Sequence, residues 1–245
     1  MHRLTFYIES PALNRPLRAH ALCPPGRGPF RVLYLLHGLG ADADIWRWYD
    51  IETLAAPRRL MVVMPDGGAS YYVNDPRAAG LGRWEDAMVR DLRGAVDRMF
   101  RTLPEREGRA IAGISMGGYG AAMLALRYPD LFAAAAVLSG SLYFGHAPHP
   151  RGQAFQNELA AALAPGEYDV FALADRIVKR GAARPALWLA CGLEDGHLAS
   201  HRGFRDHLRA RGWPVEYVEG PGAHDRQFWQ AHMPELIQFV AERLG

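Results

Sequence analysis

The 245-residue sequence is 49% hydrophobic and 22% charged, a balance typical of a globular protein with a sizeable core. Its net charge is only +2 and its arginines are scattered, so we expect neither nucleic-acid binding nor attachment to an anionic membrane. It has no signal-peptide core and no stretch near the roughly 18 apolar residues of a membrane span, which predicts a cytoplasmic protein and leaves only a trimmed signal peptide open.

Short apolar runs between turn-forming residues predict the strands of a sheet. The first two runs are separated by a turn rich in Pro and Asn, and we place them near a sheet edge. The next two are apolar throughout, which indicates strands buried on both faces. The predicted strands are residues 4–8, 17–22, 31–36, 60–64, 110–112, 133–138, 186–191 and 215–218.

Between these strands, apolar residues recur at helical spacing. Ser200 and Gly212 are typical start and stop signals for one helix, and Pro234 is expected to begin or kink the last one. After the first two strands the chain alternates strand and helix, which predicts an α/β protein: a mostly parallel sheet with helices on both faces, in one domain of residues 1–245. The predicted helices are residues 45–56, 84–100, 116–126, 155–163, 168–179, 200–211 and 236–244.

Residues 113–117, Gly-Ile-Ser-Met-Gly, have the G-x-S-x-G pattern between a predicted strand and a predicted helix. In this context the serine lies at the tip of a sharp turn, and the flanking positions must be glycine because a Cβ would not fit. We therefore predict Ser115 as a nucleophile. Because the turn opens a helix, the backbone N–H of Met116 is predicted to face the negative charge that develops on an attacked carbonyl.

A serine nucleophile needs a general base and a carboxylate that orients the base, in the chain order Ser, acid, His for this architecture. His224 lies in a Gly-rich loop after the last predicted strand, and we predict it as the base. Glu194 and Asp195 both follow the preceding strand as candidate acids, and Asp66 at another strand end is a weaker alternative. Since carboxyl ends of parallel strands share one edge of a sheet, we expect these groups to meet Ser115 there.

The segment His37-Gly38-Leu39 follows the third predicted strand. In this architecture that loop supplies the second oxyanion donor, and we assign it to the backbone N–H of Leu39.

His197 and His201 have the i, i+4 spacing of helical metal ligands, but neither an intervening Glu nor a cysteine pair accompanies them. We therefore predict a solvated helix start at these positions and no metal site.

The segments described above resemble the esterase D-like family of the α/β hydrolases. This family includes tributyrin-type carboxylesterases, S-formylglutathione hydrolases, feruloyl and acetyl-xylan esterases, and mycolyltransferases. The resemblance covers essentially the whole chain and is most specific at residues 115–121, Ser-Met-Gly-Gly-Tyr-Gly-Ala. It implies an α/β-hydrolase fold, Asp195 in preference to Glu194 as the acid, and an ester or thioester hydrolase without a cofactor. The other resembling segments are residues 10–13, 37–40, 191–195 and 222–225, the last followed by Phe228-Trp229.

We expect a serine carboxylesterase that hydrolyses small, short-chain acyl esters, with a small-molecule ester as its partner and a homo-oligomer left open. Two long stretches, residues 67–83 and 141–168, are expected to form the pocket walls. Tyr72 and Trp84 are candidate substrate contacts, with core packing an equal alternative. Formylglutathione hydrolysis, feruloyl or acetyl esterase activity and acyl transfer stay open, whereas a non-enzymatic binding protein of this fold usually lacks a triad residue.

Overall fold

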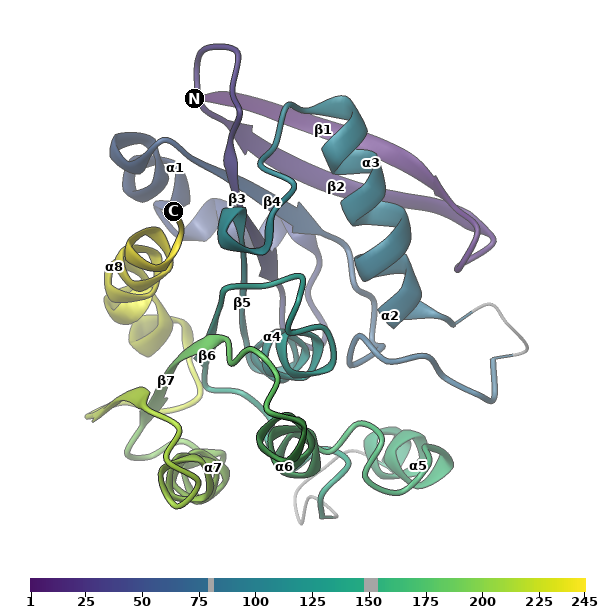
Figure 1. The fold of residues 1–245 in the computed structure, drawn as a ribbon, viewed down its shortest axis with the longest axis vertical. Helices are drawn as coiled ribbons and strands as arrows, with labels where there is room; N and C mark the ends of the chain where they lie inside the picture. Colours follow the sequence, from purple (N-terminus) through teal and green to yellow (C-terminus); the bar gives the residue numbers. More distant parts are fainter. Residues whose placement is uncertain (79–81, 148–153) are drawn as a thin grey trace.

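The computed structural model describes residues 1–78, 82–147 and 154–245. Its centre is an eight-stranded sheet in the order β1-β2-β4-β3-β5-β6-β7-β8. Figure 1 shows the helices arranged around this sheet. β1 and β2 are antiparallel to their neighbours, and β3 to β8 run parallel, which confirms the predicted mostly parallel sheet. The strands are β1 (His2–Ser10), β2 (Arg15–Cys23), β3 (Arg31–Leu36), β4 (Leu60–Pro65), β5 (Arg109–Ile114), β6 (Ala134–Leu138), β7 (Ala186–Gly192) and β8 (Val215–Gly220).

Hydropathy explains the position of each strand in the sheet. β4, β5 and β6 are buried along their whole length, and their sequences are almost entirely apolar. β1 and β8 are the two edges. β1 alternates buried and exposed residues from Phe6 onward, and every residue of β8 is exposed or half-exposed. The polar residues of the outer strands are therefore those that a sheet edge can leave in water.

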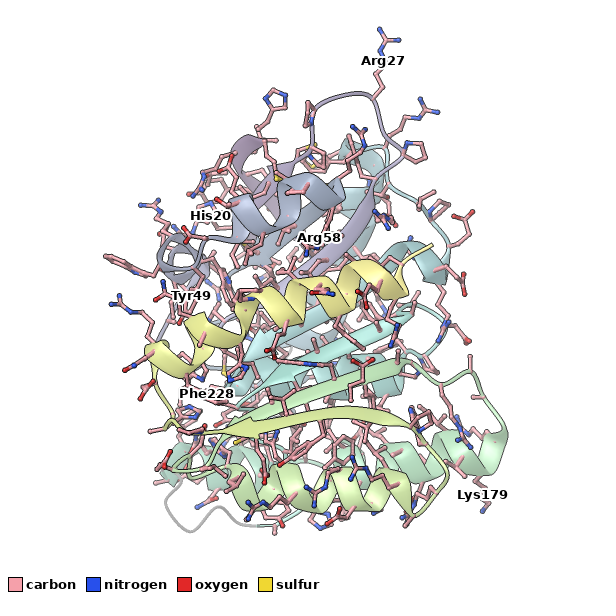
Figure 2. The ribbon with its side chains drawn as sticks, turned by 90° about the vertical axis from the view of Figure 1, so that its left-hand side faces the viewer. His20, Arg27, Tyr49, Arg58, Lys179 and Phe228 are labelled. Atoms are coloured by element: carbon pink, nitrogen blue, oxygen red, sulfur yellow. The ribbon has the colours of Figure 1, made fainter. Side chains whose placement is uncertain are left out.

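Helices cover both faces of the sheet, as predicted (Figure 1). α1 and α8 pack on one face, and in Figure 2 α8 crosses in front of the strands with Phe228 near its N-terminal end. α3, α4, α6 and α7 pack on the other face. The α-helices are α1 (Ile51–Ala55), α2 (Trp84–Asp86), α3 (Arg93–Met99), α4 (Met116–Arg127), α5 (Ala154–Ala162), α6 (Val170–Arg180), α7 (Leu198–Arg209) and α8 (Arg226–Arg243).

Several helix boundaries differ from the sequence predictions. In place of the single helix predicted at residues 45–56, the structure has a 3₁₀ helix, Ala43–Trp48, followed by the separate short helix α1. A π-helical segment, Ala87–Leu92, joins α2 to α3 within the predicted helix 84–100. Among the described residues, none of the helices combines the length and apolarity that a membrane crossing needs.

The helix start predicted at Ser200 is wrong, and of the two alternatives for Pro234 the structure excludes a helix start, because this proline lies inside α8. α7 begins at Leu198, so Ser200 lies inside it, where its hydroxyl donates to the carbonyl of His197 at 2.7 Å instead of capping the helix. α8 begins well before Pro234 because the carboxylate of Asp225 accepts a hydrogen bond from the N–H of Phe228 at 3.0 Å and caps the helix there.

Candidate active site

The turn between β5 and α4 holds Ser115 in strained backbone, with φ 55° and ψ −120°. A Cβ at Gly113 would lie 2.4 Å from the backbone of Gly117, and a Cβ at Gly117 would lie 2.1 Å from the carbonyl oxygen of Leu36. The N–H of Ser115 donates to Leu138 O at 2.9 Å, which ties the turn to the end of β6. Both glycines are therefore required for the turn, as the sequence predicts.

Ser115, His224 and Asp195 form one hydrogen-bonded chain at the carboxyl edge of the sheet. Nε2 of His224 lies 2.9 Å from Oγ of Ser115, and Nδ1 of His224 lies 3.0 and 3.2 Å from the two carboxylate oxygens of Asp195. The Asp195 side chain is fully buried, whereas 34% of the His224 side chain is exposed. The structure thus brings together the three side chains that sequence reasoning selected.

The pairing of β7 with β8 explains why the carboxylate and the imidazole meet. The parallel register continues past both strands, because Leu193 N donates to Gly220 O at 2.8 Å and Glu194 N donates to Gly222 O at 3.0 Å. The two loops that carry the acid and the base therefore leave the sheet side by side.

The two alternative carboxylates have other partners. Glu194 accepts a hydrogen bond from the N–H of Gly222 at 2.6 Å. Asp66 pairs with Arg18 at 2.7 Å and also accepts from the N–H of Ala43. Of the carboxylates considered from sequence, Asp195 is the one that reaches His224.

The charge state of Asp195 suits an orienting role. Burial by itself would raise the pKa of Asp195, but the hydrogen bond and charge of His224, together with the N–H of His197 at 2.8 Å, lower that pKa to about 2. The carboxylate is therefore ionised at neutral pH and holds the proton of His224 on Nδ1. Nε2 of His224 is then the nitrogen that can accept a proton from Ser115.

The loop after β3 lies against the nucleophile. A Cβ at Gly38 would lie 3.2 Å from the Cβ of Ser115, and Leu39 lines the same cavity as Ser115. His37 fixes this loop: its Nδ1 donates to Gly38 O at 2.8 Å and its Nε2 accepts from the N–H of Gly67 at 2.7 Å. Burial lowers the pKa of His37, which agrees with this neutral tautomer.

Met116 is the first residue of α4, and N–H groups of a first helical turn have no partner within the helix. The assignment of the Leu39 and Met116 N–H groups to an oxyanion hole stays a prediction, with both segments next to Ser115.

A cavity of about 270 Å³ opens at Ser115. One side is polar: Tyr71 OH accepts a hydrogen bond from the Gln156 amide, and Ser141 Oγ lies 3.2 Å from Nε2 of His197. The other residues are largely apolar. The described residues that line the cavity are Leu39, Tyr71, Ser115, Ser141, Phe144, Ala147, Gln156, Asn157, Ala160, His197 and His224.

Neither of the two candidate pocket aromatics is among the described residues that line this cavity, and the contacts of both agree with the alternative of core packing. Tyr72 is fully buried, and its hydroxyl donates to the carbonyl of His37 at 3.0 Å. Trp84 packs against Gly68 and under the guanidinium of Arg15. The neighbouring Tyr71 is the tyrosine in the cavity wall.

The prediction for the start of α7 is only half right. His197 is partly exposed in the cavity, but His201 is fully buried, and burial lowers its pKa to about 3. The packing of α7 against the sheet decides this, because it buries His201 and leaves His197, just before the helix, in the cavity wall. Sequence reasoning also missed Ser141, although its place just after β6 is the same signal that identified the triad loops.

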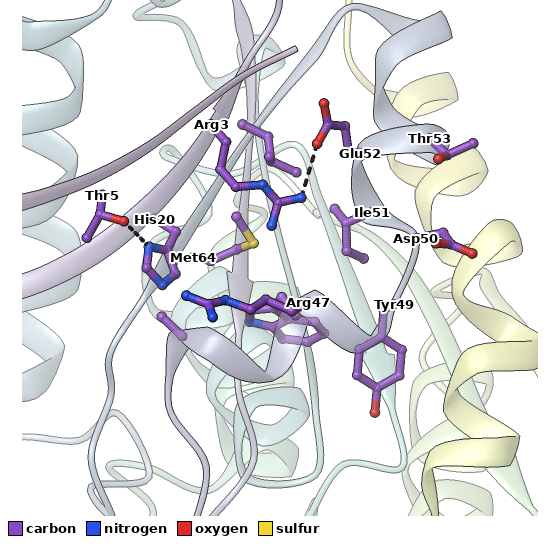
Figure 3. A pocket seen from close by; sticks show the side chains of 13 residues that line it. Arg3, Thr5, His20, Arg47, Tyr49, Asp50, Ile51, Glu52, Thr53 and Met64 are labelled. Atoms are coloured by element: carbon purple, nitrogen blue, oxygen red, sulfur yellow. Dashed lines mark hydrogen bonds and ion pairs between the residues drawn. The ribbon is translucent and has the colours of Figure 1, made fainter.

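A second cavity, of about 230 Å³, lies between β2 and the 3₁₀ helix Ala43–Trp48 (Figure 3). Several of its charged and polar groups pair within the protein: Arg3 pairs with Glu52 at 3.0 Å, and His20 bonds Thr5 at 2.9 Å (Figure 3). It shares no lining residue with the cavity at Ser115 among the residues that the structure describes. The reactive groups therefore belong to the first cavity.

Comparison with known proteins identifies the family. Residues 10–240 match the esterase family model, whose description is "Putative esterase". The chain belongs to this family of α/β hydrolases. An esterase of Mycobacterium tuberculosis is 34% identical over 227 residues, which cover 80% of this chain and 48% of that protein, so the chain spans about half the length of that relative.

Two further comparisons cover nearly whole chains. An acetyl esterase of Caldicellulosiruptor saccharolyticus is 26% identical over 226 residues, covering 86% of this chain and 84% of that protein. The structure of FphF, a fluorophosphonate-binding serine hydrolase of Staphylococcus aureus, superposes with a TM-score of 0.88 and 26% identity over 98% of both chains. The predicted α/β-hydrolase fold is thereby confirmed.

Proposed function

We propose that this chain is a serine carboxylesterase that hydrolyses small, short-chain acyl esters through an acyl-enzyme. The observation that carries the proposal is the 2.9 Å contact between Ser115 Oγ and His224 Nε2, in a chain that ends at a buried, ionised Asp195. Membership of the esterase family supports the same chemistry.

In the acylation step, Ser115 Oγ attacks the ester carbonyl while His224 Nε2 accepts the hydroxyl proton. The imidazolium that forms is stabilised by Asp195 and returns its proton to the leaving alkoxide. The N–H groups of Leu39 and Met116 would hold the oxyanion. Losing one such donor typically costs about 2.7–4 kcal/mol of transition-state stabilisation.

In the deacylation step, His224 takes a proton from water as the water oxygen attacks the acyl carbonyl. The intermediate then collapses, His224 returns the proton to Ser115 Oγ, and the carboxylic acid leaves. The partial exposure of the His224 side chain, 34%, supports hydrolysis over acyl transfer, because transfer requires a site that keeps water away from the base.

The cavity favours a small and largely uncharged substrate. Its volume of about 270 Å³ is at the lower end for ligand sites. None of the described lining residues is Arg or Lys, so these residues offer the carboxylates of a glutathione thioester no guanidinium or ammonium partner. We therefore favour simple esters over formylglutathione, and expect a higher kcat/KM for alkyl esters in a direct comparison.

The experiment uses purified protein with p-nitrophenyl acetate and p-nitrophenyl butyrate. Turnover should fall by at least about 10⁴-fold in Ser115→Ala. Ser10→Ala is the matched control, because its hydroxyl bonds Asp91 outside the cavity. A fluorophosphonate should add one adduct to the wild type and none to Ser115→Ala; full turnover in Ser115→Ala would reject the proposal.

A further inference from the structure

A second imidazole, that of His197, lies beside His224 at the carboxyl edge of the sheet, and the esterase mechanism does not use it. His197 lies two residues after Asp195, and its ring centroid is 5.0 Å from that of His224, with the planes inclined at 66°. The N–H of His197 donates to Asp195 at 2.8 Å, so the start of α7 is held against the triad acid.

We propose that Asp195, His197 and His224 form an inhibitory site for a divalent cation of the Zn²⁺ class. One ligand atom from each of the three side chains lies within 4.8 Å of the other two. The inhibitory part of this proposal rests on the proposed esterase function, whereas the binding part does not.

The donor set suits zinc better than calcium or magnesium. Two imidazole nitrogens and one carboxylate oxygen are typical zinc ligands, and three protein ligands leave a fourth position for water. Magnesium and calcium prefer oxygen ligands alone. In a tetrahedral zinc site with bonds of about 2.0–2.1 Å, ligand atoms lie about 3.3 Å apart. Ligand atoms separated by as much as 4.8 Å must therefore approach one another by up to about 1.5 Å.

His197 can supply this movement. Asp195 is buried, but His197 is only half-buried, and one of its contacts is the 3.2 Å pair with Ser141 Oγ. Rotation of the His197 ring would exchange that contact for the metal, while the Asp195 carboxylate stays close to His224, already 3.0 Å away.

Metal binding would remove the general base, whichever nitrogen of His224 is used. A cation on Nδ1 displaces the proton that Asp195 holds there and leaves the imidazole with its proton on Nε2, so Nε2 can no longer accept the proton of Ser115. A cation on Nε2 occupies the accepting lone pair directly. The expected result is reversible inhibition that a chelator relieves.

The first test measures binding without catalysis. Calorimetry of Ser115→Ala with ZnCl₂ should give one site, and Co²⁺ should give the visible absorption of a tetrahedral centre with nitrogen ligands. Adding His197→Gln or, separately, His224→Gln to this variant should weaken binding at least about tenfold, because even loss of an outer-shell partner costs ten- to a hundredfold.

The second test measures inhibition of the wild-type esterase. Zn²⁺ should inhibit, EDTA should restore activity, and Mg²⁺ should have no effect. His197→Gln should raise the half-inhibitory concentration at least about tenfold. His232→Gln is the matched control: it removes a surface imidazole that pairs with Glu235 at 3.2 Å, and should leave inhibition unchanged.

The two tests separate this proposal from the proposed function. Zinc affinity that is unchanged by both His197→Gln and His224→Gln would overturn the metal site. Protein that binds zinc through these residues but hydrolyses no ester would overturn the esterase proposal and, with it, the inhibitory role, while the binding site would be established.

Discussion

The cavity at Ser115 has two sides, the catalytic rim with the triad residues and the insert wall opposite, and different interactions position them. The catalytic rim follows directly from the parallel sheet: Ser115 comes one residue after β5, Asp195 three after β7 and His224 four after β8. The insert wall comes from Tyr71 and from the lining residues within 141–147 and 154–168, whose positions depend on contacts between distant side chains.

Aromatic packing places the insert wall. Tyr71 stacks on Phe144 with ring centroids 4.1 Å apart, and Tyr119 meets the same Phe144 ring edge-on at 4.8 Å. Tyr119 OH donates to Tyr168 O at 2.7 Å, which ties α4 to the far end of the insert. These contacts join residues that lie far apart in the chain, and no local sequence pattern encodes them.

A buried carboxylate anchors the same wall from below. Glu85 accepts hydrogen bonds from Tyr168 and Tyr128, each at 2.6 Å, and from the guanidinium of Arg127. A buried carboxylate with three donors holds its surroundings rigidly. The triad residues follow strand ends, whereas the opposite wall of the cavity is an insert that is anchored separately. We therefore expect changes in the wall to alter substrate choice without moving the triad.

The largest expected effect concerns the acid of the rim. Asp195→Asn should lower kcat about 10⁴-fold, because the amide cannot hold the Nδ1–H tautomer of His224. Glu194→Gln, the matched neighbour, should change kcat less than about tenfold, since Glu194 bonds only the Gly222 N–H among its described contacts. Steady-state kinetics on p-nitrophenyl acetate check both, and the reverse order would show that Glu194 is the acid.

A second prediction tests how precisely Ser115 must be positioned for catalysis. Gly38→Ala places a methyl group 3.2 Å from the Cβ of Ser115 and should displace the nucleophile by a few tenths of an ångström. We expect kcat to fall about tenfold with little change in KM, because small misplacements of reacting groups are costly. Gly196→Ala is the control, since a Cβ there meets nothing within 4 Å. Equal kcat values for the two variants would show that catalysis tolerates a small displacement of Ser115.

A third prediction concerns how the buried imidazole of His201, in α7, makes the stability of the protein depend on pH. The pKa of His201 is lowered to about 3 by burial, so the folded protein keeps this imidazole neutral while the unfolded chain binds a proton below about pH 6.5. The stability that His201 contributes is therefore complete above pH 6.5 and lost as the pH falls toward 3, by up to about 1.4 kcal/mol per pH unit.

Urea unfolding between pH 7 and 4 checks this prediction. His201→Leu should reduce the slope of the free energy of unfolding against pH by that amount. An unchanged slope in His201→Leu would mean that the imidazole can be protonated in the folded protein.

The smallest expected effect compares two adjacent tyrosines: Tyr71 lies in the insert wall, and Tyr72 is buried against the loop of His37. Tyr71→Phe removes the hydroxyl that contacts Gln156 in the wall and should change the preference between acyl groups by about two- to tenfold in kcat/KM. Tyr72→Phe leaves the buried carbonyl of His37 without that donor and should lower the free energy of unfolding by about 1–3 kcal/mol. A panel of acyl-chain lengths and urea unfolding separate the two. A stability loss in Tyr71→Phe with no change in preference would show that the wall does not contact substrate.

Much of the rim was predictable from sequence because its signals are local. The glycines of residues 113–117 require one tight turn, buried apolar runs predict parallel strands, and residues after such strands share one edge. These local signals are sufficient to select Ser115 and His224, whereas the family resemblance is needed to prefer Asp195 over Glu194.

The tertiary structure alone decided what lies opposite the triad. Tyr71 and Tyr72 both have positive φ values, 52° and 58°, so neither strand nor helix periodicity tells which one faces the cavity. Likewise, the burial of His201 depends on how α7 packs. α5 lines the cavity, and Glu85 holds the insert wall, through contacts between elements that are distant in the sequence. Local sequence determined the turn and the strand ends, whereas side-chain packing between distant segments determined the wall, because such packing depends on the whole fold and not on neighbouring residues.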